Sequence, residues 1–474
     1  MAEPHTPTST DSSSAHPVAT GIKWGPFTLR IPFVHMRLSL THLLQGLAVS
    51  GATGLALVPY YMAFLGLTFD EAVMMVIIHS TLISSAWWLF GDPYAPGWLT
   101  PAIPFVIAFI SLPVFAGVPT LMFQAMTALA LNFAVILLIL GVTGWGEKLI
   151  SIVPNVLKGG IILGAAIAAF MRVTKDGDAA NVFQSAPIAG TLGVVLCLLV
   201  AFSKPLQAIA QHKQWLAKLI GLGLLPGFIL AGVVGFFTSE FTYNIRWEWL
   251  DMTGATLSLW EKASPFYIGW PSVDTFFAAF PLALITYILF FGDVVTGNEM
   301  LEQAQTQRQD EILDINPSRT HMATGIRNAI MGVLAPFFCT QGVLWTGIQV
   351  VLLKNWTDKH SDGSFQTRSY YDNLSSFYVF GLPFLFMILP FVSLLQPLLP
   401  VALAVTLILT AFACATLALS LVTDATERGA MVITAMAFSL FEPWLGLLLG
   451  IATIIGLCGL RVFTKPLVDV NNDA

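Results

Sequence analysis

Charged residues are scarce in this sequence. Of the 474 residues only 10% are Asp, Glu, Lys or Arg, whereas 56% are hydrophobic. Soluble domains carry about 25% charged residues, so this chain lacks the polar surface that an aqueous domain needs. It also has no basic stripe of the kind that nucleic acid requires. The composition therefore predicts an integral membrane protein whose main partner is the lipid bilayer, and it excludes nucleic-acid binding.

Cysteine and metal-binding motifs are nearly absent. The four cysteines are Cys197, Cys339, Cys414 and Cys458, and no two of them form a C-x-x-C pair. This spacing indicates neither a disulfide framework nor a zinc site, and the eight histidines form no H-E-x-x-H pattern. No nucleophile and base are paired within an apolar segment. We therefore expect no enzyme activity, no bound metal and no cofactor other than Na⁺ or H⁺ as a coupling ion.

Long apolar segments dominate the rest of the chain. A membrane-spanning helix needs about 20 mostly apolar residues. Fourteen segments qualify as spans or short spans: 39–63, 68–90, 101–116, 119–141, 149–171, 187–203, 215–238, 273–296, 320–336, 342–354, 377–395, 399–421, 428–442 and 444–462. They predict an all-α membrane protein of about 14 transmembrane helices. Residues 1–20 are rich in Ser, Thr and Pro without an apolar stretch, which predicts a disordered tail rather than a signal peptide.

The distribution of basic residues predicts the orientation. With the N-terminus inside, 15 of the 21 Lys and Arg residues fall in inside loops and four in outside loops. Such a bias predicts that both termini are cytoplasmic, in a plasma membrane or a bacterial inner membrane. Residues 239–270 then form an outside loop, and its many aromatic residues favour a position at the membrane surface.

Two of the short spans each follow an irregular stretch. The first stretch, residues 91–104, carries four prolines, which a continuous helix does not tolerate. The second runs from Pro336 to Gly342. The short spans that follow are the third and the tenth, the same position in each half of a 7+7 chain, which is typical of an inverted repeat with a central site. We expect two half-helices preceded by short extended segments, whose N-terminal amide groups suit an anion. The alternative is that both stretches are loops between longer helices.

Several segments resemble one large clan of transporters. The clan contains nucleobase–ascorbate transporters, sulfate permeases and bicarbonate transporters. Its helices are resembled by five segments of this chain: 44–59, 100–106, 152–160, 291–293 and 325–347. The resemblance is to a divergent, uracil-permease-like member and covers nearly the whole chain.

The resemblance implies a core domain of helices 1–4 and 8–11, a gate domain of helices 5–7 and 12–14, an elevator movement of the core, and a homodimer through the gate. The expected domain boundaries are 1–38 for the cytoplasmic tail and pre-helix, 39–141 for the first core part, 142–238 for the first gate part, 239–270 for the extracytoplasmic loop, 271–376 and 377–398 for the second core part, and 399–474 for the second gate part with a short tail.

Two departures from this clan bear on the solute. Nucleobase permeases place a glutamate where this chain has Leu289, and a second one in a cluster that here is Val343-Leu344-Trp345. Because both carboxylates are missing, a nucleobase is disfavoured as the solute. We expect a secondary active transporter for a small anion (an inorganic oxyanion, bicarbonate, a carboxylate or a sulfonate) coupled to H⁺ or Na⁺. A nucleobase-type permease and a passive anion channel are the alternatives.

Among the charged residues of the predicted spans, Lys158, Asp293 and Arg327 are the candidates for a functional role. Lys158 is expected to face an anionic solute or to pair with Asp293, unless its long side chain reaches the cytoplasmic interface. Asp293 shares a helix face with Thr286 and is the predicted site of the coupling ion, the alternative being a carboxylate at the end of a helix in water. Arg327 could pair with Asp293 or a lipid headgroup, or serve the structure alone.

The remaining predicted site residues are polar or lie at the two breaks. Gln45, three residues after His42 on the first span, is expected to bind the solute or a neighbouring helix. The other predicted substrate-binding residues are Thr100, Pro101, Ala102, Cys339, Thr340, Gln341, Gly342 and Trp345. Their side chains could cap the half-helices or contact the solute.

Overall fold

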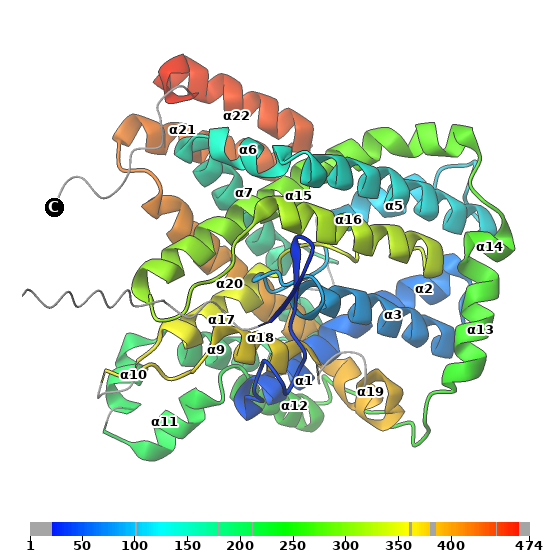
Figure 1. Cartoon of the computed structure of the whole chain (residues 1–474). Coiled ribbons are helices and arrows are strands. Elements are labelled where there is room, and N and C mark those ends of the chain that lie inside the picture. Colours follow the sequence, from blue (N-terminus) through cyan, green and yellow to red (C-terminus); the bar gives the residue numbers. More distant parts are fainter. Residues whose placement is uncertain are drawn as a thin grey trace, which may run out of the picture.

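The computed structural model describes residues 21–99, 102–177, 181–210, 212–359, 363–379, 385–441 and 443–463. The predicted disordered tail, residues 1–20, and the site residues Thr100 and Pro101 lie outside these ranges. The described chain is almost entirely helical (Figure 1). Its only sheet in these ranges is a two-stranded antiparallel hairpin of β1 (Ile22–Trp24) and β2 (Phe27–Leu29).

The helices follow one another with short connections. In chain order they are α1 (Leu40–Gly54), η1 (Leu55–Leu57), α2 (Val58–Leu65), α3 (Phe69–Trp88), α4 (Ile103–Ile110), α5 (Pro119–Val142), α6 (Trp145–Ile152), α7 (Asn155–Thr174), α8 (Val182–Ser185), α9 (Ala189–Phe202), α10 (Lys204–Ala210), α11 (Gln214–Gly221), α12 (Leu225–Phe237), α13 (Met252–Ala263), α14 (Pro265–Ile268), α15 (Val273–Gln307), α16 (Pro317–Leu334), α17 (Thr346–Thr357), α18 (Tyr370–Val379), η3 (Leu385–Met387), α19 (Leu389–Leu395), η4 (Gln396–Leu398), α20 (Leu399–Ser420), α21 (Ala425–Leu440), α22 (Pro443–Cys458) and η5 (Leu460–Phe463).

Several helices suit a bilayer by length and composition. In the described ranges five stretches are long and apolar enough to span it: α3, α5, α7, α15 and Leu389–Ser420, which includes α19 and α20. The pair α9 and α10, bent by 68°, would make a sixth. Together with the hydrophobic composition, these helices make the chain an all-α integral membrane protein. The count of 14 spans and the 7+7 repeat stay predictions.

The long helices begin at residues that satisfy free backbone amides. The Thr68 side chain accepts from the Glu71 amide at 3.3 Å while the Glu71 carboxylate accepts from the Thr68 amide at 2.8 Å, which is a capping box. Ser272 starts α15 and Asn316 starts α16 in the same way, each by accepting a hydrogen bond from an amide three residues on. These capping residues determine where α3, α15 and α16 begin.

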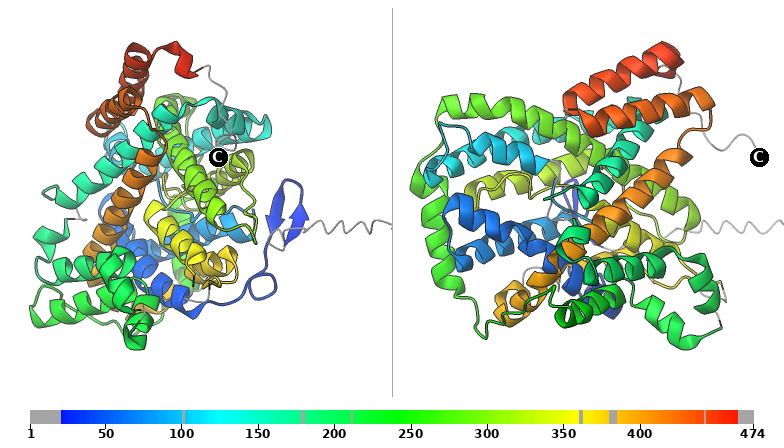
Figure 2. Two further views of the ribbon diagram at one scale, coloured as in Figure 1. Left: turned by 90° about the vertical axis from the view of Figure 1, so that its left-hand side faces the viewer. Right: turned by 180° about the vertical axis from the view of Figure 1, so that it is seen from behind.

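The helices pack in two sets that meet around α15 and α17. In one set α5 packs along α15 and α16, while α3 contacts α2, α16 and α18. In the other α7 packs against α20, α21 and α22, and α9 against α12. Figures 1 and 2 show α20, α21 and α22 gathered on one side of the molecule and α3, α5 and α16 on the other. Contacts of α17 with α20 and of α15 with α7 join the two sets.

Three predicted boundaries are wrong. The segment 101–116 is helical only over α4 and then forms turns, because Pro113 disfavours helical backbone at the residue before it. The tenth segment begins its helix at Thr346 instead of residue 342, since the chain is still extended at the break. Residues 377–395 are not one helix: α18 ends at Val379, and α19 starts again at Leu389 with proline in its first turn.

Two further boundaries change the position of charged residues. Pro154 separates α6 from α7, so Lys158 lies in the first turn of α7 and not some nine residues into a helix as the sequence indicated. Helix α15 continues to Gln307, eleven residues beyond the predicted end at residue 296. Glu299 is therefore helical, and Asp293 lies well inside its helix rather than at the end of it.

The N-terminal hairpin, which the sequence did not predict, is attached to the end of α3. The Thr28 amide donates to the Phe90 carbonyl at 3.3 Å and the Arg30 amide to the Trp88 carbonyl at 2.6 Å. The Arg30 guanidinium, 1% exposed, donates to the Gly91 carbonyl at 2.9 Å and lies 3.8 Å from the centre of the Tyr371 ring. The hairpin thus fixes the chain at the point where α3 gives way to the first break.

The segment 239–270 forms a cap. Helix α13 lies across the ends of α3 and α5 (Figure 1). The Lys262 ammonium donates to the buried Glu71 carboxylate at 2.7 Å, and Ser258 also donates to it. Trp247 and Trp249 are 84% and 76% exposed, in agreement with the expected aromatic surface, although its position at the membrane interface stays a prediction.

We expect Glu71→Ala to release α13 from α3. The substitution removes the capping box and the buried carboxylate that holds Lys262 and Ser258, and the lost cap alone costs about 1–2 kcal/mol. Hydrogen exchange of residues 252–263 should accelerate. Lys262→Met is the matched control, because it removes only a half-exposed cation and should cost less than about 1 kcal/mol. Unchanged exchange in Glu71→Ala would show that apolar contacts alone hold the cap.

Candidate functional site

The first break is an extended segment held by side chains from other helices. Residues 91–99 are not helical, as their prolines predict. The Ala95 amide donates to Oε1 of Gln349 on α17 at 2.6 Å, and the Tyr378 hydroxyl donates to the Pro96 carbonyl at 2.7 Å. Backbone polar groups inside an apolar protein need such partners. The first break is thus an ordered segment of the protein interior with hydrogen-bond partners of its own.

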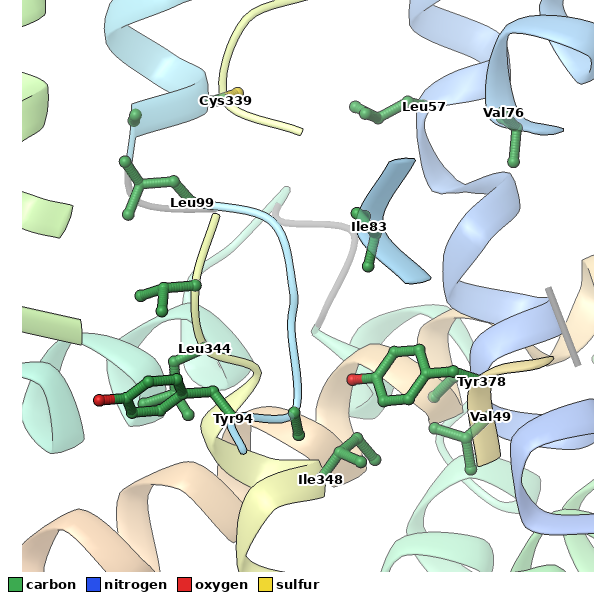
Figure 3. Packing of buried hydrophobic residues seen from close by; sticks show 14 of the residues in the cluster. Val49, Leu57, Val76, Ile83, Tyr94, Leu99, Cys339, Leu344, Ile348 and Tyr378 are labelled. Atoms are coloured by element: carbon green, nitrogen blue, oxygen red, sulfur yellow. The ribbon is translucent and has the colours of Figure 1, made fainter. Parts of the chain in front are cut away.

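The second break lies directly against the first. The Leu99 amide donates to the Cys339 carbonyl at 2.8 Å, and the Trp345 amide donates to the Ala95 carbonyl at 2.7 Å. The two segments therefore run antiparallel, and Figure 3 shows Tyr94 and Leu99 on one beside Leu344 and Cys339 on the other. We call residues 94–99 together with 339–345 the crossing. The sequence predicted two broken segments; their meeting in space is visible only here.

The crossing depends on two glycines. A Cβ on Gly342 would lie 2.7 Å from the Gly97 carbonyl oxygen and 2.9 Å from the Leu99 nitrogen. A Cβ on Gly97 would lie 2.7 Å from the Cβ of Trp345. Only glycine lets the two backbones approach this closely. Cys339 has a φ of 78°, a strained conformation for a side chain with a Cβ, and its carbonyl is the one that Leu99 holds.

A buried arginine lies behind the crossing. Arg327 on α16 is 1% exposed, and its Nη2 donates to the Gly342 carbonyl at 3.1 Å and to Thr324 Oγ1 at 2.9 Å. Among the described residues its Nε and Nη1 have no hydrogen-bond partner. Neither the predicted pair with Asp293 nor contact with a lipid headgroup is compatible with this position. A guanidinium with two free donors is suited to an anion.

The neighbouring Asn328 ties the second break to α16. Its Nδ2 donates to the Gln341 carbonyl at 2.9 Å and to the Thr324 carbonyl at 2.9 Å. Gln341 in turn donates through Nε2 to the His79 carbonyl on α3 at 3.1 Å. The second break is therefore fixed between α16 and α3, which holds the crossing in place relative to Arg327.

A neighbouring charge cluster anchors the start of the first break, and its Asp92 carboxylate also interacts electrostatically with Arg327. Asp92, 1% exposed, accepts from Arg319 Nε at 3.2 Å and from Thr320 at 3.0 Å. Arg319 also donates to Asp314 at 2.6 Å, and Lys23 of the hairpin reaches Asp314 at 3.2 Å. Burial of Asp314 opposes its charged form, but the charges and hydrogen bonds of Arg319 and Lys23 outweigh it and hold the pKa of Asp314 below its ordinary value. The role of these ion pairs is thus structural: they hold the start of the first break.

The other residues predicted at the break are mainly structural in their contacts. Thr340 donates to the Phe337 carbonyl at 3.1 Å, and Trp345 packs edge-on against Phe377. Ala102 is fully buried just before α4. The crossing thus brings together Cys339, Gly342 and Trp345 of the predicted set, with Gln341 beside them.

Gln45 and Thr286 form no hydrogen bond with the crossing among the described residues. Gln45 is fully buried against Gly223, and both of its amide atoms lack a partner among the described residues. His42, which lies on the same helix face as Gln45, forms hydrogen bonds with Ser39 at 2.7 Å and with Asn355 at 2.9 Å. Thr286 donates to the Leu282 carbonyl of its own helix at 2.7 Å.

The predicted charge partners are different from the observed ones. Lys158 Nζ lies 2.5 Å from Oε1 of Glu299, six residues after Asp293, so the predicted Lys158–Asp293 pair is wrong. Asp293 is half-buried and makes no hydrogen bond or ion pair with another described residue. Glu299 was not a predicted site residue, because six residues after Asp293 place it on a different face of the same helix.

Arg327 and Glu299 were therefore not among the predicted site residues. Arg327 is a charged residue inside a predicted span and Glu299 lies three residues beyond one, which is the signal that could have selected them. The described chain contains no group of three or more His, Cys, Asp or Glu side chains placed to hold a metal ion. The described site consists of helix ends, extended backbone and buried charges, most of them paired. It contains no nucleophile paired to a base.

Comparisons with known proteins agree only at the level of structure. Neither a family model nor a curated protein matches the sequence. The structure is similar to the transmembrane domain of a cyanobacterium bicarbonate transporter, BicA, with a TM-score of 0.47 and 13% identity over 88% of this chain and 99% of that one. It is also similar to SLC26A9, with a TM-score of 0.45 and 12% identity over 88% of this chain and 65% of that one. Neither likeness assigns a function to this chain.

Proposed function

We propose that this protein is a secondary active transporter for a small anion, such as an inorganic oxyanion, bicarbonate, a carboxylate or a sulfonate. The observation that carries the proposal is the crossing, where two extended segments some 240 residues apart in the chain are joined by hydrogen bonds of 2.7 and 2.8 Å. Each segment leads into a helix start, α4 or α17. Irregular backbone at membrane depth is tolerated where it is buried or lines a solute path.

The positive charge next to the crossing favours an anion as the solute. The first amides of α4 and α17 carry the positive end of each helix dipole. Arg327 adds a guanidinium group with two donors that no described residue uses, and Asp92 offsets part of its charge. Leu289 and the Val343-Leu344-Trp345 stretch supply no carboxylate for a nucleobase. We assign solute contact to Ala102 and to Cys339, Thr340, Gln341, Gly342 and Trp345 at the second break, and, on the sequence alone, to Thr100 and Pro101.

We propose that transport occurs by an elevator movement, in which one set of helices moves as a rigid body against the other. The set of α3, α5, α15 and α16 would be the moving core, and the set of α7, α20, α21 and α22 the static gate through which two copies form a homodimer. Only a few helix pairs join the two sets, which suits a rigid displacement of one against the other. The excess of basic residues in inside loops places both termini in the cytoplasm.

The coupling ion is assigned to Asp293, with Thr286 on the same helix face. We expect Asp293→Asn to abolish gradient-driven uptake, because a neutral amide neither takes up a proton nor neutralises Na⁺. Exchange of labelled for unlabelled solute at equal concentrations should survive. The measurement is accumulation in reconstituted vesicles with and without imposed H⁺ and Na⁺ gradients. Accumulation equal to that of the parent protein would remove Asp293 from this role.

Two experiments test the function itself. A thermal-shift panel of the purified protein against oxyanions, bicarbonate, carboxylates, sulfonates and nucleobases should show stabilisation by one class of anion, since a ligand that binds the folded state raises its melting temperature. Vesicle flux should then saturate with that anion and respond to an ion gradient. Stabilisation only by neutral heterocycles would favour the nucleobase alternative, and flux without saturation or coupling would favour a channel.

A further inference from the structure

The N-terminal hairpin ends in a buried arginine whose guanidinium is only partly used. Arg30 directly follows β2 and is 1% exposed. Its Nη1 donates to the Gly91 carbonyl at 2.9 Å, whereas its Nε and Nη2 have no hydrogen-bond partner among the described residues. In a guanidinium group Nε and Nη2 form one edge with parallel N–H bonds, the geometry that binds two oxygens of one anion. The free edge of Arg30 is therefore suited to bidentate binding.

No carboxylate of the described chain is hydrogen-bonded to Arg30. Asp92 and Asp314 accept from Arg319, and Glu311 accepts from donors of α17 and α18. A charge taken out of water is costly unless a partner of opposite sign compensates it. Arg30 thus lacks, among the described residues, the anion that a buried cation requires.

Two hydroxyl groups beside Arg30 are also unused. The Arg30 guanidinium carbon lies 3.8 Å from the centre of the Tyr371 ring on α18, and the hydroxyl of this buried tyrosine has no partner in the part of the chain that the structure describes. The same holds for the buried hydroxyl of Thr28, two residues before Arg30. Arg319 adds a second cation that interacts electrostatically with Tyr371. A ring stacked on the guanidinium covers its face and leaves its edge open.

Water is the alternative occupant of this place. Asp92 Oδ2 has no hydrogen-bond partner among the described residues either, and a buried water could bridge it to Arg30. Water carries no charge, however, and would leave the buried guanidinium without a counterion. The Asp92 carboxylate also repels further negative charge, so a monovalent anion is favoured over a divalent one.

We propose that the free edge of Arg30 binds a small monovalent oxyanion, such as bicarbonate or a carboxylate, in a second site between the hairpin, Gly91 and α18. The site goes beyond the proposed function, since it uses neither the crossing nor Arg327. Its groups come from three parts of the chain: Thr28 and Arg30 from the hairpin, Gly91 from the start of the first break, and Tyr371 from α18. A bound anion would therefore stabilise the hairpin in its attached position.

Hydrogen exchange of the hairpin in the full-length protein tests the site. Residues 22–29 should exchange about threefold or more slowly in sodium bicarbonate or sodium acetate than in sodium chloride at the same pH and ionic strength, because a ligand that binds only the attached hairpin disfavours its opening. Equal exchange in the three salts would overturn the proposal, since a site filled by water does not respond to the oxyanion.

Variants test the bidentate edge. Arg30→Lys keeps the charge without the parallel donors, so the slowing by oxyanions should be lost. Tyr371→Phe removes only the hydroxyl and should raise the half-maximal oxyanion concentration about 2- to 10-fold. Arg37→Gln is the matched control, because Arg37 is an exposed cation seven residues after Arg30, and the slowing should persist.

The quantity compared is the ratio of exchange rates in oxyanion and chloride within each variant, so a loosened hairpin alone does not change it. Full slowing in Arg30→Lys would show that a point charge suffices and would overturn the bidentate site. Loss of the slowing in Arg37→Gln would reveal a general effect of surface charge and would overturn it as well. If Arg30→Lys does not fold, an unchanged half-maximal concentration in Tyr371→Phe has the same consequence.

Arg327→Gln separates this site from the proposed solute site. It removes the guanidinium behind the crossing and leaves Arg30 and Tyr371 in place, so the slowing in residues 22–29 should persist. Loss of the slowing in Arg327→Gln together with its survival in Arg30→Lys would locate the anion at the crossing and overturn the second site. Vesicles that move no anion would contradict the proposed function and leave the result for the hairpin unaffected.

Discussion

Replacement of Arg327 by glutamine is expected to weaken anion binding by about 10- to 100-fold, because a hydrogen bond to a charged group contributes about 1.5–3 kcal/mol and each 1.4 kcal/mol is about a tenfold change. The basis is the pair of donors, Nε and Nη1, that no described residue uses, on a side chain 1% exposed behind the crossing. The measurement is the KM of vesicle uptake, together with the ligand-induced thermal shift. Arg327→Lys keeps the charge but not the planar donor pattern, so its affinity should lie between the two.

Arg308 offers a matched control for this loss. It is also buried, at 2% exposure, but its guanidinium is fully used by Asp310 and by the carbonyls of Trp356, Thr367 and Arg368. Arg308→Gln should lower the melting temperature and leave KM unchanged. If both variants changed the melting temperature and neither changed KM, Arg327 would be a purely structural residue that holds the Gly342 carbonyl, and the anion preference would lose its main support.

Gly342→Ala is expected to disrupt the crossing and to remove transport. The added Cβ would lie 2.7 Å from the Gly97 carbonyl oxygen and 2.9 Å from the Leu99 nitrogen, both backbone atoms that cannot turn aside. Overpacking of this kind costs about 1–3 kcal/mol, and separation of the segments breaks the two hydrogen bonds of the crossing at about 1 kcal/mol each. The melting temperature should fall and the uptake rate should fall with it.

Gly456 on α22 provides the control. A Cβ there would meet nothing within 4 Å, and the residue lies inside a helix. Alanine is favoured over glycine in a helix by about 1 kcal/mol, so Gly456→Ala should leave transport unchanged and stability equal or higher. Uptake by Gly342→Ala at the level of Gly456→Ala would mean that transport does not need the two segments in contact.

The sequence predicted the breaks because proline chemistry is local. Pro93 and Pro96 exclude a helix wherever the rest of the chain lies, and the run from Pro336 to Gly342 interrupts an apolar segment in the same way. Composition decided the class of protein for a similar reason, since a chain that is 56% hydrophobic can bury its surface only in a bilayer. The solute class rests mainly on the position of Arg327 in the structure and stays a proposal.

Helix boundaries were less predictable because hydropathy does not detect their ends. The apolar run that holds Lys158 is interrupted by Pro154, and the polar end of α15 continues as a helix to Gln307. A window that follows only apolar residues placed Lys158 too deep and Glu299 outside. Both errors concealed the ion pair at 2.5 Å, which forms between side chains 141 residues apart.

By itself the sequence determined a helical membrane protein with two interrupted segments, since charge content, apolar length and proline act on a chain irrespective of its partners. Only the tertiary structure decided that the segments meet at Gly97 and Gly342, that two donors of Arg327 behind them are used by no described residue, and that Lys158 pairs with Glu299. These are contacts between residues distant in the chain. Their partners depend on how helices pack in space, which no local pattern of residues encodes.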